Sequence, residues 1–431
     1  MVALWSEIWY NIGQSTNRME TNIMSDEMLT SRRAMTAEEE GAVLGESFVC
    51  PYCRTVSKLG EVMAVAVSSE LMGDSVLGEY EARRFLPSHF TKHGLAIDAC
   101  GGVCTLAACP HCHMAVPQLL LETEQMSLAV IGAVGAGKSV FLASSMWECR
   151  QKLSANFGLV LTDLEPAANR WINAYEEKLF FQSEPTELQQ IEKTELQDPH
   201  VSRMVKIRGE NVLLPLPSFF YLQRPKDETR QSLVIYDSAG EHFRAGAPTQ
   251  NSMVTLNMLT ASAIFFMFDP SAEPRFRSML DMGKGTAQNN AQRQDILLSE
   301  MASRLRRYMG TKQERRLSKP LIFGVSKADL LRHHLPLGVD VYREGADGKM
   351  ALDLGALRKV SDETEALLKK VVPDVVATVH GVANEVWFVP VSALGHNPMK
   401  EGIRPCDIHP ICAELPLVLT LAHKGLIPTV G

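Results

Sequence analysis

From Ser127 to the end of the chain, short apolar runs alternate with longer segments of helical periodicity. This alternation predicts an α/β fold, in which a mainly parallel sheet is covered by helices on both faces. Helical patterns lie at about 139–152, 287–308 and 361–372. The apolar runs that we expect to form strands are Ser127–Ile131, Leu159–Thr162, Phe219–Leu222, Leu233–Tyr236, Ala263–Phe268, Leu321–Val325 and Val386–Val391.

The same pattern divides the chain into three parts. Residues 1–45 are polar and methionine-rich without sustained periodicity, and we interpret them as a tail, with Met19 and Met24 as alternative start positions. Residues 46–122 hold six of the nine cysteines, and residues 123–431 form the α/β domain. No internal repeat is evident. Two polar stretches of the domain are expected to be loops or small insertions, at 183–211 and 331–357.

Composition excludes several classes of protein. Of 431 residues, 45% are hydrophobic and 22% charged, which is typical of globular domains and not of disordered, collagen-like or coiled-coil chains. The net charge of −7 gives no general attraction to nucleic acid or to an anionic membrane. No apolar run reaches the roughly 18 residues of a membrane span, and the N-terminus lacks the pattern of a secretory signal. We therefore expect a cytoplasmic protein without membrane attachment.

The segment Gly132–Ser139, with the sequence GAVGAGKS, fits the pattern GxxxxGK[ST] between a predicted strand and a predicted helix. Its glycines, among them Gly135 and Gly137, allow backbone N–H groups to turn toward a phosphate, and the helix N-terminus adds a favourable dipole. We expect Lys138 to reach the β- and γ-phosphates and the Ser139 hydroxyl to bind Mg²⁺. This loop predicts a nucleoside triphosphate, without distinguishing ATP from GTP.

A second motif follows the apolar run Leu233–Tyr236. Asp237 at the end of that run can hold Mg²⁺ through water, and the backbone amide of Gly240 can meet a γ-phosphate. Asp and Gly are also common turn residues, so a plain turn is the alternative interpretation. The position after four apolar residues and downstream of the phosphate loop favours the nucleotide site.

A third motif, SKAD, follows the strand predicted at Leu321–Val325. The carboxylate of Asp329 can accept hydrogen bonds from the N1–H and 2-amino groups of guanine, whereas adenine offers neither donor there. The stem of Lys327 can lie over the base. This motif therefore favours GTP and GDP as the ligands, with Ser326 at its start.

A fourth motif, SAL, follows the strand predicted at Val386–Val391. Here a backbone N–H of the Ser392-Ala393 segment can contact the guanine oxygen. Any one of the four motifs could be a strand followed by a polar turn. Their order along the chain, each at a strand end, makes coincidence a poor explanation.

With GAVGAGKS, DSAG, SKAD and SAL in this order, residues 127–426 resemble the Ras-like, translation-factor-related class of P-loop GTPases. More narrowly, the chain is similar to bacterial double-GTPase families proposed for conflict (anti-phage or self/non-self) systems, through CPHCHMAVPQLLLE, DSAGEHF and LPLVLTLAHKGLIP. The resemblance implies a GTPase that acts as a nucleotide-controlled switch in a defence or signalling operon. It also implies protein partners that sense the nucleotide state, and a nucleotide-dependent oligomer.

Two departures from the class bear on the chemistry. Ser326 stands where many relatives have Asn or Thr, and its hydroxyl can still brace the phosphate loop. Glu241 stands where Ras-like enzymes have a water-orienting Gln, and His242 follows it. A carboxylate beside a triphosphate is repelled unless it is protonated or turned away. We expect His242, or else Glu241, to position water, and hydrolysis to be slow or to need a partner.

The resemblance also implies a switch threonine between the first helix and the strand near residue 219. Thr186 is our choice, with Thr194 second, and a plain loop threonine is the alternative for both. Mg²⁺ would then be held by Ser139, Thr186 and Asp237. A partner could supply an arginine finger. Three residues of this chain are candidates for one, although each is more typical of a solvated surface: Arg244, Arg275 and Arg277.

The cysteines contain two CPxC pairs, Cys50-Pro-Tyr-Cys53 and Cys109-Pro-His-Cys112. Each pair places two thiolates on one tight turn, and two such turns facing each other form a tetrahedral Zn²⁺ site. Four protein ligands leave no open position, so the predicted role is structural, in a zinc ribbon. The alternatives are four buried thiols or a redox pair.

The remaining cysteines and their neighbours have weaker patterns. Cys100 and Cys104 could replace one CPxC pair, while His111 and His113 are expected beside the site or exposed. Basic clusters at 83–93 and 304–316 are typical of solvated faces or partner surfaces. The cysteines without partner spacing are Cys149, Cys406 and Cys412.

Three interpretations of function follow. The leading one is a zinc-ribbon GTPase that changes conformation between its GTP and GDP states. The second is a non-hydrolysing scaffold, which holds nucleotide structurally and recruits a protein partner through the zinc module. Glu241, in place of a water-orienting Gln, is the feature that favours this second interpretation. The third is a P-loop ATPase acting on nucleic acid, which SKAD and the net charge disfavour.

Overall fold

The computed structural model describes residues 47–184, 186–188, 202–207, 209–239, 253–280, 293–309, 316–345, 348–398 and 402–431. The chain forms two compact units. The first comprises Met1–Glu124 with Ser202–Leu214, and the second comprises Gln125–Val201 with Pro215–Gly431. The segment Ser202–Leu214, which the sequence pattern placed in the α/β domain, therefore belongs to the cysteine-containing unit. No helix in the described part of the chain is long and apolar enough to span a membrane.

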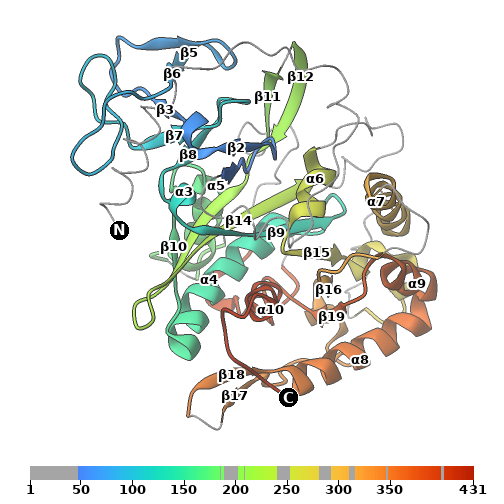
Figure 1. The fold of residues 1–431 in the computed structure, drawn as a ribbon. Helices are drawn as coiled ribbons and strands as arrows, with labels where there is room; N and C mark the ends of the chain where they lie inside the picture. The colour runs from blue at the N-terminus through green and yellow to red at the C-terminus, as the bar shows by residue number, and fades with distance from the viewer. Residues whose placement is uncertain are drawn as a thin grey trace. The chain divides into compact units, whose positions relative to one another are not determined.

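The second unit is built on a seven-stranded sheet of order β10-β13-β14-β9-β15-β16-β19 (Figure 1). Strands β9, β15, β16 and β19 are parallel, whereas β10 pairs with β13 and β13 with β14 in antiparallel fashion. The sheet is thus mixed, with its parallel half toward β19. Its strands are β9 (Glu124–Gly132), β10 (Val160–Asp163), β13 (Ser218–Arg224), β14 (Thr229–Ala239), β15 (Ala263–Phe268), β16 (Leu321–Val325) and β19 (Val386–Pro390).

The described part of this unit also contains α-helices and short 3₁₀ turns. The α-helices are α4 (Lys138–Phe157), α5 (Arg170–Phe180), α6 (Met253–Thr260), α7 (Gln294–Tyr308), α8 (Leu354–Val371), α9 (Pro373–Val382) and α10 (Leu415–His423). Short 3₁₀ turns are η4 (Pro270–Ala272), η5 (Pro274–Phe276), η6 (Ala328–Leu331) and η7 (Pro405–Asp407).

Strand β15 shows why the sheet is covered on both faces. Its sequence AIFFMF is buried throughout, and successive side chains of a strand point to opposite faces. Phe265 packs against Phe141 of α4, with ring centroids 5.0 Å apart. Phe266, which points to the other face, stacks at 5.5 Å on Phe323, its pairing partner on the adjacent strand β16. A strand without a polar face must be covered on both sides.

The stretch 331–357, expected to be a loop or insertion, forms part of a small separate sheet. Strand β18 (Met350–Asp353) pairs with β17 (Tyr342–Glu344) in antiparallel and with β20 (Thr429–Val430) in parallel orientation. The pairing partner at Thr429 lies near the chain end, about 80 residues away in sequence, so local hydrophobic periodicity did not predict this sheet.

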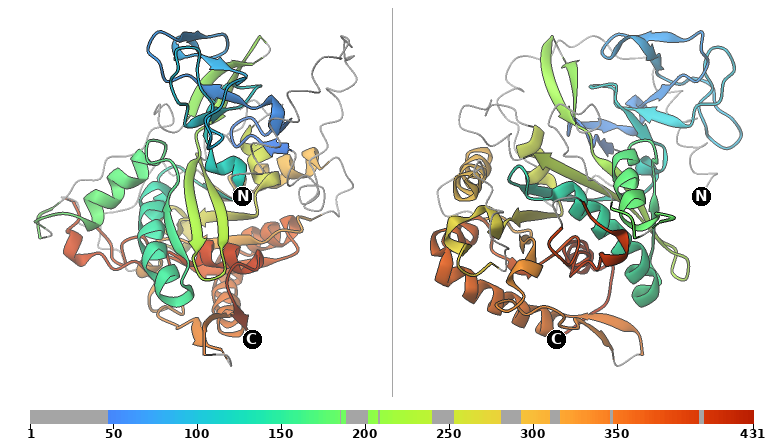
Figure 2. Two further views of the ribbon diagram at one scale, coloured as in Figure 1. Left: turned by 60° about the vertical axis from the view of Figure 1, so that its left-hand side comes forward. Right: turned by 180° about the vertical axis from the view of Figure 1, so that it is seen from behind.

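The first unit consists of short strands and turns. A four-stranded sheet has the order β6-β3-β7-β8. The described residues of this unit also form three two-stranded sheets, β1-β2, β4-β5 and β11-β12. The β11-β12 pair lies beside the N-terminal strands in both views of Figure 2. The elements are β1 (Ser47–Val49), β2 (Val56–Lys58), η2 (Leu59–Glu61), β3 (Met63–Val65), β4 (Met72–Asp74), β5 (Gly78–Ala82), β6 (Arg84–Phe85), β7 (Leu106–Ala108), β8 (Ala115–Pro117), α3 (Leu119–Glu122), β11 (Ser202–Ile207) and β12 (Glu210–Pro215).

Candidate functional site

The phosphate loop runs between β9 and α4, as its sequence predicted. Gly137, the residue before α4, has a φ of 86°, a left-handed conformation that favours glycine. A Cβ at Gly132 would lie 2.7 Å from the Met267 carbonyl oxygen of neighbouring β15. Glycine is therefore required at Gly132 for strand packing, and at Gly137 for the turn. The Nζ of Lys138 donates to the carbonyl oxygens of Gly132 and Ala133 at 3.0 and 3.1 Å.

Asp237 stands at the end of β14, near the Lys138 side chain. Its Oδ1 is buried and has no hydrogen-bond partner among the described residues. Burial raises the pKa of the Asp237 carboxyl above its usual range, and the Lys138 ammonium opposes this shift. An orphaned, buried carboxylate oxygen beside a phosphate loop fits a site for Mg²⁺, because a metal-bound water or the ion itself would satisfy it.

Asp329 and Ser392 meet at the ends of the adjacent parallel strands β16 and β19. The Ser392 hydroxyl donates to Asp329 Oδ1 at 2.5 Å and accepts a hydrogen bond from the Gly395 N–H at 2.9 Å. Both side chains are buried. A Cβ at Gly395 would lie only 1.9 Å from the His409 carbonyl oxygen, so this turn requires glycine. The arrangement fixes one oxygen of the Asp329 carboxylate.

The backbone of Ser392 has a different role from the one expected. Its N–H donates to the Ile411 carbonyl oxygen at 2.9 Å, and its carbonyl accepts from Ile411 at 2.8 Å. The Ser392 N–H is therefore engaged within the protein, and the contribution of Ser392 comes through its hydroxyl. A backbone contact to the base would then come from Ala393.

Two further residues of the SKAD segment, Ser326 and Lys327, have defined surroundings. The Ser326 hydroxyl is buried without a hydrogen-bond partner among the described residues, so it does not brace the phosphate loop here. Lys327 has a left-handed φ of 51°, and its Nζ pairs with Asp269 Oδ2 at 2.7 Å and Ser271 Oγ at 3.0 Å. The sequence motifs did not identify Asp269 as a residue of this site. Its position directly after the apolar run Ala263–Phe268 could have indicated it.

Several predicted residues are not brought to this site by the described part of the chain. Thr186 lies in an exposed turn after α5 and has no hydrogen bond to Ser139 or Asp237. Arg275 is engaged by Glu273 at 2.8 Å and by Asp374 at 2.5 Å, which argues against a free finger, and Arg277 is exposed. The predictions that fall outside the described residues concern Thr194, Gly240, Glu241, His242 and Arg244.

The two CPxC pairs come together in the first unit. The Sγ atoms of all four cysteines lie within 4.8 Å of one another. Cys50 Sγ is 3.7 Å from Cys112 Sγ, and Cys53 Sγ is 3.7 Å from Cys109 Sγ. A tetrahedron of thiolates about zinc, with bonds of ~2.3 Å, has edges of ~3.8 Å. The residues present therefore fit Zn²⁺.

Both CPxC turns have the same backbone geometry. In the first, the Tyr52 N–H donates to Cys50 Sγ at 3.4 Å, and in the second the His111 N–H donates to Cys109 Sγ at 3.4 Å. The residue after each turn is left-handed, with φ of 57° at Arg54 and 58° at His113. N–H groups aimed at sulfur stabilise thiolates, which is the form that binds metal.

The other cysteines do not join this cluster. Cys100 is exposed and lies 3.7 Å from Glu70, and Cys104 donates to the Gly102 carbonyl, so neither replaces a CPxC ligand. The His113 ring pairs with Asp74 at 2.8 Å instead of facing the cluster. Burial raises the pKa of Cys412 to about 12, so it is an inert thiol at neutral pH.

No protein-family model matches the chain, and no curated protein matches it. Among solved structures, the chain is similar to the Saccharomyces cerevisiae Ski7 GTPase-like domain bound to GTP (14% identity, TM-score 0.30, covering 71% of this chain and 52% of that one). It is also similar to Aquifex aeolicus Era bound to GDP and AlF4⁻ (12% identity, TM-score 0.25, 72% and 59%). The chain thus spans little more than half of these two neighbours.

A third similar structure is the signal recognition particle receptor SRb–GTP/SRX complex from Chaetomium thermophilum (13% identity, TM-score 0.22, 66% of this chain and 97% of that one). TM-scores this low carry no weight for function.

Proposed function

We propose that the chain is a guanine-nucleotide switch that binds GTP and GDP with Mg²⁺ and hydrolyses GTP to GDP and phosphate. The observation that carries the proposal is the buried pair Asp329–Ser392, at the same strand-end edge as the phosphate loop. A buried carboxylate with one oxygen fixed by a hydroxyl suits the two donors of guanine and penalises adenine.

In this proposal the triphosphate is held by the backbone of Gly132–Ser139 and by Lys138. Ser139 and Asp237, together with Thr186 in the GTP state, would hold Mg²⁺, and the bound ion would neutralise charge on the phosphate oxygens. Lys138 is already near Asp237. His242 or Glu241 would orient the attacking water, and the Gly240 amide would meet the γ-phosphate.

A competition titration of the purified protein with Mg²⁺, GTP and ATP tests the nucleotide preference. We expect GTP to bind at least ~100-fold more tightly, which corresponds to ~2.7 kcal/mol. Equal affinity, or a preference for ATP, would contradict the guanine site. Phosphate release from GTP then separates a hydrolase from a scaffold that retains nucleotide without turnover.

We further propose that the Cys₄ cluster is a structural zinc site in a ribbon-like module. Its four ligands are Cys50, Cys53, Cys109 and Cys112, which leaves the metal without an open position for chemistry. The ion would stabilise a unit made of short strands, because metal binding by the folded state adds to its folding free energy.

The narrower sequence resemblance supports a role in the cytoplasm of a bacterium, in a conflict or signalling operon. A protein partner would sense the nucleotide state, with a nucleotide-dependent oligomer as one form of that response. Neighbouring genes and a phage-challenge assay with and without the gene test this role. Wild-type plating efficiency after deletion, in a strain that the intact operon protects, would contradict it.

A further inference from the structure

The β11-β12 hairpin belongs to the cysteine-containing unit, but both of its ends continue into the nucleotide-binding unit. Strand β12 ends at Pro215 and β13 begins at Ser218, so only Leu216 and Pro217 connect them. Proline fixes φ, and a residue before proline is restricted to extended conformations. The connection between the hairpin and the sheet is therefore two residues long, and its backbone conformations are restricted.

This two-residue link leads into the sheet close to the proposed Mg²⁺ carboxylate. Strand β13 pairs with β14, and its first residue, Ser218, lies opposite Ile235. Ile235 precedes Asp237 by two residues on β14. The next residue of β13, Phe219, is held at both backbone groups: its N–H donates to Asn169 Oδ1 at 2.8 Å, and its carbonyl accepts from Asn169 Nδ2 at 2.7 Å. The start of β13 is thus held in place within the second unit.

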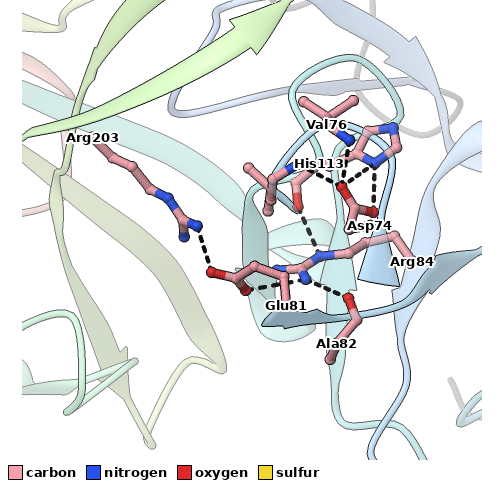
Figure 3. Close-up of polar contacts among 8 residues, drawn as sticks. Asp74, Val76, Glu81, Ala82, Arg84, His113 and Arg203 are labelled. Carbon is pink, nitrogen blue, oxygen red and sulfur yellow. Dashed lines mark hydrogen bonds and ion pairs between the residues drawn. The ribbon is translucent and has the colours of Figure 1, made fainter. Parts of the chain in front are cut away.

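The hairpin is joined to the other strands of the first unit by a series of polar contacts that starts at Arg203, near the beginning of β11 (Figure 3). Arg203 of β11 forms an ion pair with Glu81 Oε1 of β5, and Glu81 Oε2 lies 3.3 Å from Arg84 Nη1. Arg84, whose side chain is 5% exposed, donates through Nε to the His113 carbonyl oxygen at 3.0 Å. One carboxylate, Glu81, therefore joins two arginines from distant segments.

This series of polar contacts ends at a CPxC turn. His113 follows Cys112 directly, and its N–H donates to the Cys109 carbonyl oxygen at 2.9 Å, which closes the turn. The side chain of Asp74, which is 2% exposed, pairs with the His113 ring. It also accepts hydrogen bonds from the N–H groups of Val76 and Leu77. The position of His113 is thus fixed from both sides, and so is the carbonyl that Arg84 contacts.

We propose that the β11-β12 hairpin couples the nucleotide site to the Cys₄ metal site, with Glu81 as the positioning residue that joins the hairpin to the CPxC turn. The proposal rests on the function proposed above and assigns a regulation to it. Because coupling free energies are reciprocal, the bound nucleotide changes zinc retention and zinc changes nucleotide affinity. The cysteine module is then the part of the protein that responds to the nucleotide state.

The test measures zinc release from the full-length, zinc-loaded protein into excess 4-(2-pyridylazo)resorcinol, with saturating GDP or a non-hydrolysable GTP analogue. Coupling between two sites typically amounts to about 5–150-fold. We expect at least a fivefold difference in release rate between the two nucleotides. In Glu81→Gln this ratio is expected to fall below twofold. The matched control is Glu79→Gln, an exposed position two residues earlier on β5 that has no ion pair among the described residues, and it should keep the ratio.

Arg203→Lys keeps the charge opposite Glu81 and is expected to retain most of the ratio, whereas Arg203→Ala loses it. Equal release rates in wild type with both nucleotides bound would overturn the coupling and leave the guanine-nucleotide function standing. A ratio preserved in Glu81→Gln would overturn the role of Glu81. Failure of both nucleotides to bind in the parallel titration would overturn the proposed function, and the coupling with it.

Discussion

The hydroxyl of Ser392 donates a 2.5 Å hydrogen bond to Oδ1 of Asp329, and both residues are buried at the ends of adjacent parallel strands. Loss of this hydroxyl leaves a buried carboxylate oxygen without its partner, which costs about 1–3 kcal/mol. We expect Ser392→Ala to weaken GTP binding about tenfold or more in a fluorescence titration.

Ser326→Ala is the informative comparison for that experiment. Ser326 directly follows β16, the strand beside β19, but its hydroxyl has no hydrogen-bond partner among the described residues. We therefore expect a smaller loss than in Ser392→Ala. A larger loss for Ser326→Ala would mean that its hydroxyl contacts the nucleotide and that the Ser392–Asp329 bond contributes little.

Replacement of the guanine-reading carboxylate should change the base preference. Asp329→Asn replaces an acceptor with an amide that can donate, which suits the 2-oxygen of xanthine. We expect the variant to prefer xanthosine triphosphate over GTP, measured by competition against a fluorescent analogue. An unchanged preference for GTP would remove Asp329 from the base site.

Lys138→Ala tests the phosphate loop. The ammonium donates to the carbonyl oxygens of Gly132 and Ala133, and these partly exposed bonds add little to folding, so the melting temperature should change by only a few degrees. Nucleotide affinity is expected to fall at least ~100-fold, because the charge opposite the β- and γ-phosphates is lost. Lys359→Ala, an exposed change on α8, is the control. Retained affinity in Lys138→Ala would refute the phosphate-loop assignment.

Metal analysis tests the Cys₄ cluster. We expect about one zinc per chain in the wild type and none in the double variant Cys50→Ser/Cys109→Ser, which removes one ligand from each CPxC turn. Cys100→Ser/Cys406→Ser removes the two exposed cysteines outside the cluster and should retain zinc. A folded wild type that contains no metal after expression with added zinc would contradict the zinc site.

Stability should depend on pH through Glu176 of α5. Burial raises the pKa of Glu176 from its usual 4.5 to about 7, with Asp163 adding to the shift and Arg150 opposing it. The folded state therefore holds a proton that the unfolded state releases, so this residue makes folding less favourable as pH rises from about 4.5 through 7.

Glu176→Gln removes that dependence. Relative to wild type, its free energy of unfolding is expected to be higher at pH 8 by on the order of 2–3 kcal/mol, and nearly equal at pH 4.5. Urea unfolding at both pH values measures the difference. Glu177→Gln, a change at the exposed neighbour on the same helix, is the matched control. A Glu176→Gln gain that is the same at both pH values would show that Glu176 titrates normally.

Much of the core sheet could be predicted from local pattern. The runs Ala263–Phe268 and Leu321–Val325 are the strands β15 and β16 residue for residue, because fully buried strands are continuous apolar runs. The orientation of β10 and β13 could not be predicted in this way. Each pairs with its neighbour in antiparallel fashion, and strand direction depends on connections and partners, not on the composition of one run.

The candidate site shows the same division. The positions of Lys138 at the start of α4, and of Asp237 and Asp329 near the ends of β14 and β16, followed from short motifs. The hydroxyl bond of Ser392, the ion pair of Lys327 with Asp269 and the engagement of Arg275 did not, since each joins segments that lie far apart in the sequence. The role expected for the Ser326 hydroxyl at the phosphate loop is not found here, because that hydroxyl has no partner among the described residues.

The sequence by itself determined the strand-end motifs, the phosphate loop and the two CPxC turns, because glycine conformation, buried runs and tight turns are local properties of the chain. Only the tertiary structure decided that the four sulfurs meet, and that Ser202–Leu214 joins the cysteine unit through Arg203 and Glu81. The physical reason is that these contacts gain their free energy from pairs of groups whose closeness depends on the whole chain having folded.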